Sequence, residues 1–340
     1  MENEKGNTKV IGIVIVVAVL AVVGYVLTRP SPPAPAGPAP KLILGAETSL
    51  LTAPVWVAEN KGFFKEEGIE VTIKEFGSGR ASFVAMLKRE GVDICTVAPT
   101  PIMFNSFERQ DFTILATFVY SYDDVKVIAR KDKGIKEASD LKGKKVGTPA
   151  GTTGQFFLAA YLTHNGIESA AVEAVNIAPA ALPSARSEGT VDAIVVWEPH
   201  AFNAGKSSGE NAVRLPSSEV YKETFNFLAM KDFTRENPEA LKRFLRAISR
   251  AITFIRKNKE EAQSLVAQRL KLDMKVMTVL WDDFVFDISL EQSLLVTLED
   301  EARWAIKSKL TERTEVPNYL EFVHIDALKA IRPETVTVIH

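Results

Sequence analysis

The strongest constraint on the fold is a repeated alternation of short apolar stretches with longer amphipathic ones. From residue 41 onward, strand-like stretches at 41–46, 69–76 and 92–97 are separated by helix-like stretches at 55–65 and 80–90. Strands that alternate with helices in this way predict a mostly parallel sheet whose two faces are covered by helices. The chain is therefore expected to have an α/β fold.

A second unit of the same kind follows, after which the pattern changes to helices alone. Further strands are expected near Lys145, at 172–177 and at 191–196, with a helix beginning after Gly154. Beyond Asn237, apolar residues recur at helical spacing: Leu241, Phe244, Leu245, Ile248, Ile252 and Ile255. The sequence thus predicts two α/β units and a helical C-terminal region.

Small and polar residues follow several of the predicted strands. In open α/β sheets, ligands bind beyond the carboxyl ends of the strands. We therefore predict a ligand cleft between the two units, lined by these loop residues: Thr48, Ser49, Ser78, Gly79, Thr100, Thr152, Thr153, Trp197 and Glu198.

One of these loops opens a helix. Thr152 or Thr153 suits the N-cap, and residues 155–162 carry an apolar helical face. A helix start presents unpaired N–H groups and a partial positive charge, which suit a small anionic or polar group. An ordinary capped helix is the alternative interpretation. The stretch is not a P-loop, because the Gly-Lys-Ser/Thr ending is missing.

Composition narrows the class of protein. The net charge of −2 gives no reason to expect a nucleic-acid partner. A single cysteine, Cys95, excludes an internal disulfide framework and a cysteine-rich metal site. The four histidines are scattered and no nucleophile elbow or metal motif is present. We therefore expect no enzyme activity, no metal and no cofactor.

The amino terminus differs from the rest of the chain. Residues 10–27 form an apolar run of about 27 Å as a helix, close to the roughly 30 Å hydrocarbon core of a bilayer. We predict a transmembrane anchor or uncleaved signal there, with residues 1–9 in the cytoplasm and 28–40 as a stiff Pro/Ala linker. Cleavage near 34–36 remains the alternative. The binding domain is then expected outside the cytoplasm, in the periplasm or the extracellular space.

Several motifs together resemble a known family. They occupy residues 54–71, 76–79, 92–101, 140–147, 151–153 and 189–199. Across about residues 41–260, the chain resembles the nitrate/sulfonate/taurine and thiamine-precursor family of ABC-transporter solute-binding proteins. The resemblance implies a two-lobe, type II periplasmic-binding-protein fold, a small-molecule ligand, a permease and an ATPase as partners, and a monomer.

The resemblance also implies a domain division. Two crossover strands are expected near 120–126 and 225–230. The first lobe then comprises 41–121 and 229–340, and the second comprises 122–228. A sensory module that reports ligand occupancy to a separate protein is the second functional class compatible with this fold.

The ligand is less constrained than the family. Glu47 stands where sulfonate-type members tend to carry an amide, and Glu198 follows Trp197, which is either a flat cleft wall or a core residue. A carboxylate in a dry cleft favours a zwitterion such as taurine or a ligand with an amine. Asp123 and Asp124 at the hinge are alternative carboxylates.

Other ligands and surfaces stay open. A thiamine-type pyrimidine or an aromatic carboxylate are the alternative ligands, and Arg80 is a candidate source of positive charge. The C-terminal helices carry a basic face, interpreted as solvated or, alternatively, as a contact with permease or lipid: Arg243, Arg246, Arg250, Arg256 and Lys257.

Overall fold

The computed structural model describes residues 39–207, 209–217 and 220–339. The predicted anchor at 10–27, the cytoplasmic segment at 1–9 and nearly all of the predicted linker lie outside these residues. Within the part of the chain that is described, no helix has both the length and the apolar character needed to cross a membrane.

The first sheet has six strands in the order β11-β4-β10-β3-β1-β2. Strands β2, β1 and β3 are parallel, whereas β10, β4 and β11 pair antiparallel. The strands are β1 (Lys41–Glu47), β2 (Glu70–Phe76), β3 (Ile94–Val97), β4 (Phe112–Ser121), β10 (Glu223–Met230) and β11 (Phe284–Ser289).

The second sheet has five strands in the order β7-β6-β8-β5-β9. Here β7, β6 and β8 are parallel, and β5 is antiparallel to both β8 and β9. The strands are β5 (Lys126–Arg130), β6 (Lys145–Thr148), β7 (Glu173–Asn176), β8 (Ala193–Val196) and β9 (Ala212–Leu215).

Two sheets flanked by helices confirm the predicted α/β, two-lobe fold class. Most strands of each sheet share one direction: β10 and β11 run opposite to the other four strands of the first sheet, and β5 runs opposite to the other four strands of the second. The strands next to the crossings between sheets, β4, β5, β9 and β10, pair antiparallel.

The chain passes between the sheets twice. The first crossing, 122–125, joins β4 to β5, and the second lies between the end of β9 at Leu215 and the start of β10 at Glu223. The second crossing lies earlier than the expected range of 225–230. Residues 225–230 instead pair with β3 and β4, since this fully buried apolar run forms a central strand of the first sheet.

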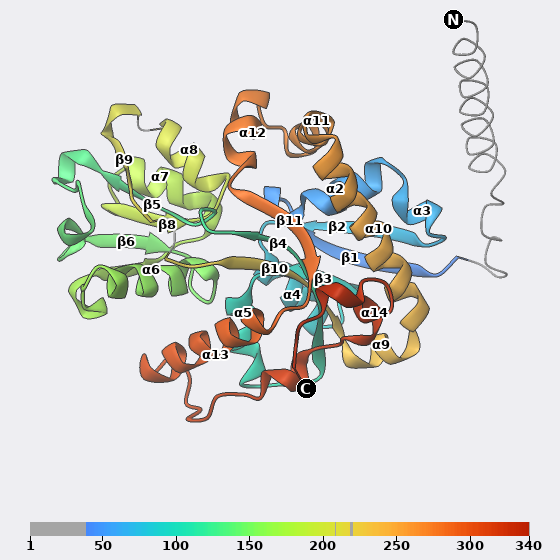
Figure 1. Ribbon diagram of the computed structural model, residues 1–340. Coiled ribbons are helices and arrows are strands. Elements are labelled where there is room, and N and C mark those ends of the chain that lie inside the picture. The colour runs from blue at the N-terminus through green and yellow to red at the C-terminus, as the bar shows by residue number, and fades with distance from the viewer. Residues whose placement is uncertain (1–38, 208, 218–219, 340) are drawn as a thin grey trace, which may run out of the picture. The chain divides into compact units, whose positions relative to one another are not determined.

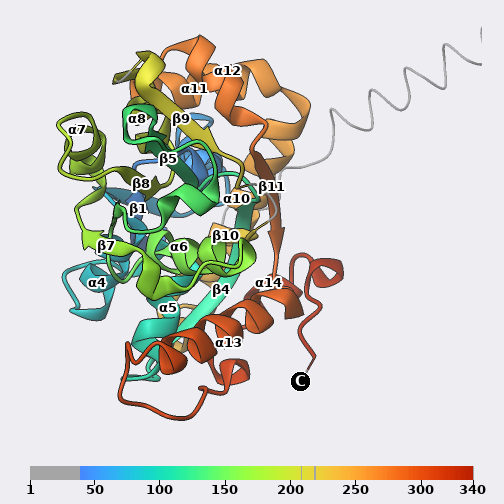
Figure 2. The same ribbon diagram turned by 90° about the vertical axis from the view of Figure 1, so that its left-hand side faces the viewer.

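Helices cover both sheets (Figures 1 and 2). In the N-terminal two-thirds of the chain they are α2 (Ala53–Asn60), α3 (Phe63–Glu66), α4 (Gly79–Leu87), α5 (Pro99–Ser106), α6 (Thr153–His164), α7 (Leu182–Ser187) and α8 (His200–Ser207). The C-terminal region adds α9 (Lys231–Glu236), α10 (Pro238–Lys257), α11 (Lys259–Leu270), α12 (Met274–Trp281), α13 (Gln292–Lys307) and α14 (Asp326–Lys329).

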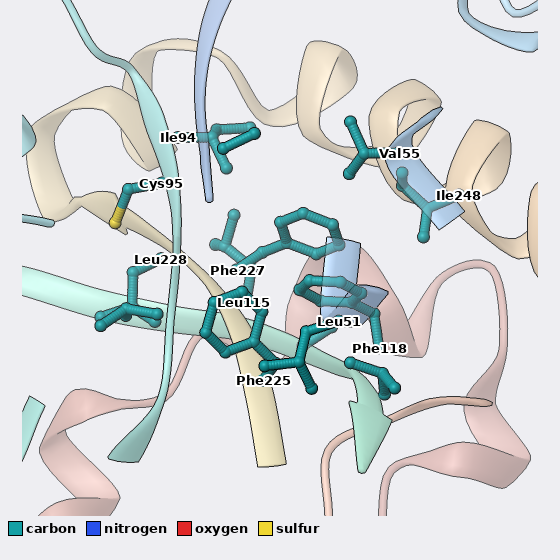
Figure 3. Packing of buried hydrophobic residues seen from close by; sticks show 14 of the residues in the cluster. Leu51, Val55, Ile94, Cys95, Leu115, Phe118, Phe225, Phe227, Leu228 and Ile248 are labelled. Carbon is teal, nitrogen blue, oxygen red and sulfur yellow. The ribbon is translucent and has the colours of Figure 1, made fainter. Parts of the chain in front are cut away.

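Each sheet has its own hydrophobic core. In the first core, aromatic rings pack between β4, β10 and α10, stacked in the Phe118–Phe227 pair and edge-to-face in the Phe227–Phe244 pair. The Phe118 and Phe227 ring centroids lie 3.9 Å apart, and those of Phe227 and Phe244 lie 4.9 Å apart (Figure 3 shows the Phe118–Phe227 part of this packing). Cys95 is buried in the same core. This packing anchors the C-terminal helical region to the first sheet.

The basic face of α10 pairs within the chain. Arg246 Nε lies 2.8 Å from Glu67 Oε2, and Arg250 pairs with both Glu66 and Glu67. Arg256 Nη2 donates to the Phe286 carbonyl at 2.8 Å. These contacts join α10 to α3 and β11, so much of this face is a structural contact rather than a freely solvated surface.

Candidate ligand cleft

A cavity lies between the two sheets, at the ends of β1, β3 and β8 and at the starts of α4 and α6. Its volume is about 20 Å³, enough for about one water molecule, which needs roughly 10–15 Å³. The lining residues are Glu47, Leu51, Ser78, Gly79, Arg80, Ala98, Pro101, Thr152, Thr153, Trp197, Glu223 and Phe225. The cleft is therefore closed, with both sheets contributing to one small chamber.

Five of the nine predicted site residues line this cavity: Ser78, Gly79, Thr152, Thr153 and Trp197. They come from three loops that are far apart in sequence, as expected for the carboxyl edge of two sheets. Their role as ligand contacts stays a prediction.

The other four predicted residues do not line it. The Thr48 hydroxyl donates to Glu75 at 3.1 Å near the surface. Ser49 is buried, and its carbonyl accepts from the Trp56 indole. Thr100 is buried in the first turn of α5. These three residues do not line this cavity, and their role as ligand contacts stays a prediction.

Glu198 faces away from the cavity. Its carboxylate accepts from Lys126 Nζ at 2.7 Å and from the Phe202 N–H at 2.8 Å. Lys126 also donates to Asp283 at 2.7 Å. Glu198 therefore caps α8, pairs with a buried lysine and is not among the residues that line this cavity, and its role as a ligand contact stays a prediction.

Lys126 is charged in this setting. Burial alone would lower its pKa, but the carboxylates of Glu198 and Asp283 outweigh burial and raise the pKa above its ordinary value. Since Lys126 lies in the second sheet and Asp283 precedes β11 of the first, the ion pair ties the two sheets together.

The start of α4 is occupied by groups of the chain itself. The Ser78 hydroxyl caps α4 by accepting from the Ala81 N–H at 3.2 Å. The Gly79 N–H donates to Glu47 Oε2 at 2.7 Å. A Cβ at Gly79 would lie 2.9 Å from the Phe225 ring, so only glycine permits this close approach. One helix start facing the cavity already has a carboxyl partner.

The start of α6 is similar. The Gly151 N–H donates to the Gln155 side chain at 2.7 Å, and the Thr152 hydroxyl donates to the Pro149 carbonyl at 2.7 Å. The Thr153 hydroxyl hydrogen-bonds to Glu223. The Gly151 N–H and the hydroxyls of Thr152 and Thr153 thus have acceptors within the chain.

Three carboxyl groups converge on the cavity and the crossings beside it. Glu47, Asp124 and Glu223 are buried, and each is at most 4% exposed. Burial raises the pKa of Glu47 to about 8. The hydrogen bond from the Gly79 N–H lowers this pKa, and the nearby charge of Asp124 raises it further. Burial raises the pKa of Asp124 to about 7. Burial, then the charge of Asp124, raises the pKa of Glu223 well above its ordinary value.

Sequence reasoning missed Glu223 in the site. It directly precedes the apolar run 225–230, and a lone carboxylate beside a strand usually marks the solvated end of that strand. The signal that could have placed Glu223 in the cleft is its position just after the second crossing. That position brings it to the cavity and next to Asp124 of the first crossing.

Trp197 is both a core residue and a wall of the cavity. It is 6% exposed and packs in the second core, with its ring centroid 6.2 Å from that of His200. It also lines the cavity and hydrogen-bonds to Glu47. Trp197 thereby links the end of β8 in the second sheet to the end of β1 in the first.

Arg80 supplies the only full positive charge among the lining residues. Its side chain is exposed, and its Nε lies 3.2 Å from the place that a Cβ would occupy at Gly151. Gly151 has a φ of +69° and no side chain, so the guanidinium lies close against it from the opposite sheet. Asp123, in contrast, pairs with Arg214 and does not line the cavity.

The fold and this cleft define the class of two-lobed periplasmic binding proteins. The family model described as NMT1/THI5 like matches residues 51–262, and the chain belongs to that family.

The relatives and structures similar to this chain agree with that class. A Bacillus subtilis protein provisionally named an aliphatic sulfonates-binding protein is 28% identical over 242 residues, covering 69% of this chain and 71% of that protein. The taurine-binding periplasmic protein of Escherichia coli is 30% identical over 205 residues, covering 59% and 62%.

Solved structures share the fold. The alkanesulfonate-binding protein from Xanthomonas axonopodis pv. citri, bound to MOPS, superposes with a TM-score of 0.75 at 17% identity, covering 86% of this chain and 100% of that chain. A desulfurization enzyme has the same fold with a TM-score of 0.64 at 15% identity, covering 86% and 98%. The shared fold alone therefore does not separate binding from catalysis.

Proposed function

We propose that this chain is the extracytoplasmic solute-binding component of an ABC importer, and that its cleft captures a small sulfonate- or taurine-like organic anion or zwitterion. The observation that carries the proposal is one small chamber lined from both sheets, with two helix starts facing it. The names of the relatives support the ligand class. The ligand would be delivered to a permease driven by an ATPase.

The proposal includes a hinge. Residues 41–121 and 223–340 would form the first lobe, and 122–222 the second, with the two crossings as hinges. The first lobe then begins at Glu223 rather than residue 229, because β10 belongs to the first sheet over its whole length. Closure of two lobes around a ligand is a common mode of solute capture.

We also propose the location and assembly. Residues 10–27 would hold the binding domain at the outer face of a membrane, and the domain would act as a monomer. No enzyme activity and no cofactor are proposed, since the curated relatives compared above are named as binding proteins.

Two alternatives concern the ligand and the partner of the protein. Trp197 and Phe225 give the cavity aromatic walls, which also suit a thiamine-type pyrimidine or an aromatic carboxylate. A sensory module would use the same cleft but pass ligand occupancy to a signalling partner rather than to a permease.

Thermal unfolding of the full-length chain against a ligand panel tests the proposal. The panel comprises taurine, alkanesulfonates, nitrate, bicarbonate, aromatic carboxylates and a thiamine-type pyrimidine. A ligand at about 100 times its dissociation constant adds about 2.7 kcal/mol to the free energy of unfolding. We expect a clear shift with a sulfonate or taurine that Thr153→Ala or Trp197→Phe weakens.

The control is Thr253→Ala, which removes a hydroxyl bonded to the Ser249 carbonyl on the exposed side of α10. Its ligand-induced shift should equal that of the wild type. A shift with the pyrimidine alone would replace the sulfonate class, and no shift with any compound would contradict the proposed function.

A further inference from the structure

Three of the donors beside the cavity already have acceptors within the chain. The N–H of Gly79 is bonded to Glu47, that of Gly151 to Gln155, and the Thr153 hydroxyl to Glu223. An anion placed deep in this chamber would therefore have to displace the chain's own carboxyl or amide groups. It would also meet buried carboxyls, a costly arrangement at low dielectric.

Among the described residues, no ion pair joins Glu47 or Glu223 to a cation, whereas the charges of Glu198 and Lys126 both act on Asp124. No donor of the described residues hydrogen-bonds to Oε2 of Glu223 or Oδ2 of Asp124, and both atoms are buried. The two side chains hydrogen-bond to each other, and two carboxyls can do so only by sharing a proton. Glu223 lines the cavity beside Glu47. This is the hydrogen-bonding pattern that a protonated nitrogen completes.

The positive charge lies at the other end of the site. Arg80 is exposed and lies against Gly151, so its guanidinium marks the side of the cavity that faces solvent. Leu51, Trp197 and Phe225 provide apolar walls in the same cavity. The site is therefore polar at both ends, with acidic groups inside and a basic group outside.

We infer that the ligand is a compact zwitterion that enters amine first, with its ammonium on Glu47 and Glu223 and its sulfonate or carboxylate on Arg80. The inference rests on the proposed function and narrows its ligand class. It reverses the orientation expected from the sequence, which placed the anionic group at the start of α6.

This orientation has a consequence for protons. The charged groups facing Glu47 are Asp124 and Glu223, with Trp197 and the Gly79 N–H as donors, and Arg80 lies at the outer end. An ammonium binds the ionised carboxyls, so binding releases protons. Affinity then rises with pH, by at most about tenfold per pH unit for each proton released. An anion bound at the carboxyls would require them protonated, and its affinity would fall with rising pH.

Calorimetric titration of the full-length chain with matched probes tests the inference. Taurine carries both charges, isethionate replaces its amine by a hydroxyl, ethanolamine lacks the acid, and β-alanine exchanges sulfonate for carboxylate. We expect taurine or β-alanine to bind at least about 100-fold more tightly than isethionate, because the ammonium adds about two buried hydrogen bonds between charged groups. The affinity should increase between about pH 6 and about pH 8.

Variants locate the two charges. Glu47→Gln and Glu223→Gln should each weaken binding of the zwitterion by at least about tenfold. Arg80→Gln should weaken binding of the zwitterion but not binding of ethanolamine. Glu173→Gln, an exposed carboxyl on β7, is the control. The comparison of probes on the wild-type chain stands even if a buried variant fails to fold.

The outcomes separate the two claims. Isethionate binding as tightly as taurine, with affinity that falls as pH rises, would overturn the amine-first inference while leaving a sulfonate-binding protein. No binding of any of the four probes would contradict the inference. If the alkanesulfonates and the rest of the wider panel also failed, the proposed function would fail as well.

Discussion

At the scale of single residues, Glu47 shows how one side chain serves both the fold and the site. It accepts the Gly79 N–H at the start of α4, bonds to the Trp197 indole from the other sheet, and lines the cavity. A helix start favours a nearby negative charge. Full burial opposes that charge more strongly, so the group holds its proton near neutral pH.

This predicts an unusual pH dependence of stability. The folded-state pKa values of Glu47 and Asp124, about 8 and about 7, lie above the ordinary values of 4.5 and 3.8. The folded state then binds more protons than the unfolded state, so stability is full below about pH 4 and is lost as pH rises toward 8. Each pKa unit is worth about 1.4 kcal/mol.

Denaturant unfolding between about pH 5 and about pH 8.5 measures this directly. The wild-type free energy of unfolding should fall by a few kcal/mol, and Glu47→Gln should flatten the curve because the amide cannot ionise. Glu75→Gln, on the exposed part of β2, is the matched control. Identical pH slopes for wild type and Glu47→Gln would show that this carboxyl titrates normally.

A second prediction concerns Lys126. Lys126→Met leaves Glu198 without its cation in a buried setting, where an unpaired charge costs about 3–5 kcal/mol. The double variant with Glu198→Gln removes the stranded charge and should recover part of that loss. Denaturant midpoints measure both. Equal midpoints for the single and double variants would contradict the pairing.

At the scale of elements, α13 contacts both halves of the molecule. The Trp304 ring lies 6.1 Å from that of Phe104 in α5 and 5.2 Å from that of Phe156 in α6. On the same helix, the buried Glu301 accepts from the Tyr221 hydroxyl at 2.8 Å, at the second crossing. This helix therefore stabilises the closed arrangement from outside the cavity.

Removing the Trp304 ring should favour an open arrangement. We expect Trp304→Ala to increase the radius of gyration of the ligand-free chain. Ligand binding should weaken severalfold, because closing the lobes would then require more free energy. Small-angle scattering measures the first effect. Phe254→Ala is the control, because its ring contacts Phe63 within the first half only. Equal radii for the two variants would exclude α13 as a clamp.

Elements were more predictable from sequence than contacts between them. The helix from Asn237 was predicted because Leu241, Ile248 and their neighbours keep one apolar face, and α10 buries that face. The sequence predicted Thr152 or Thr153 as the N-cap, and Thr152 holds that position in α6, but its hydroxyl donates to the Pro149 carbonyl and does not cap the helix.

The misses have a common physical cause. Glu198 pairs with Lys126, 72 positions earlier, and Glu223 meets Asp124 across two crossings, so neither partner appears in a local pattern. The reversed direction of β5, β10 and β11 was not predicted, because apolar periodicity marks a strand but not its direction.

At the scale of the whole molecule, the two sheets are joined by two crossings and by several contacts beside them. The Lys126–Asp283 ion pair, the Tyr221–Glu301 hydrogen bond and the Trp304 rings all lie outside the cavity lining. A cavity of about 20 Å³ is too small for any of the proposed ligands, so the proposed capture would require the two sheets to separate first and would couple binding to closure.

The most direct test of the central claim is a calorimetric titration of taurine into the full-length chain at about pH 8, where the ionised carboxyls favour the ammonium. The account predicts a saturable heat with one taurine bound per chain, and a loss of at least about tenfold in affinity in Glu47→Gln. A saturable heat that Glu47→Gln leaves unchanged would remove the carboxyl cluster from the site. No saturable heat with taurine or any alkanesulfonate would contradict the assignment of this cleft to sulfonate-class solute capture.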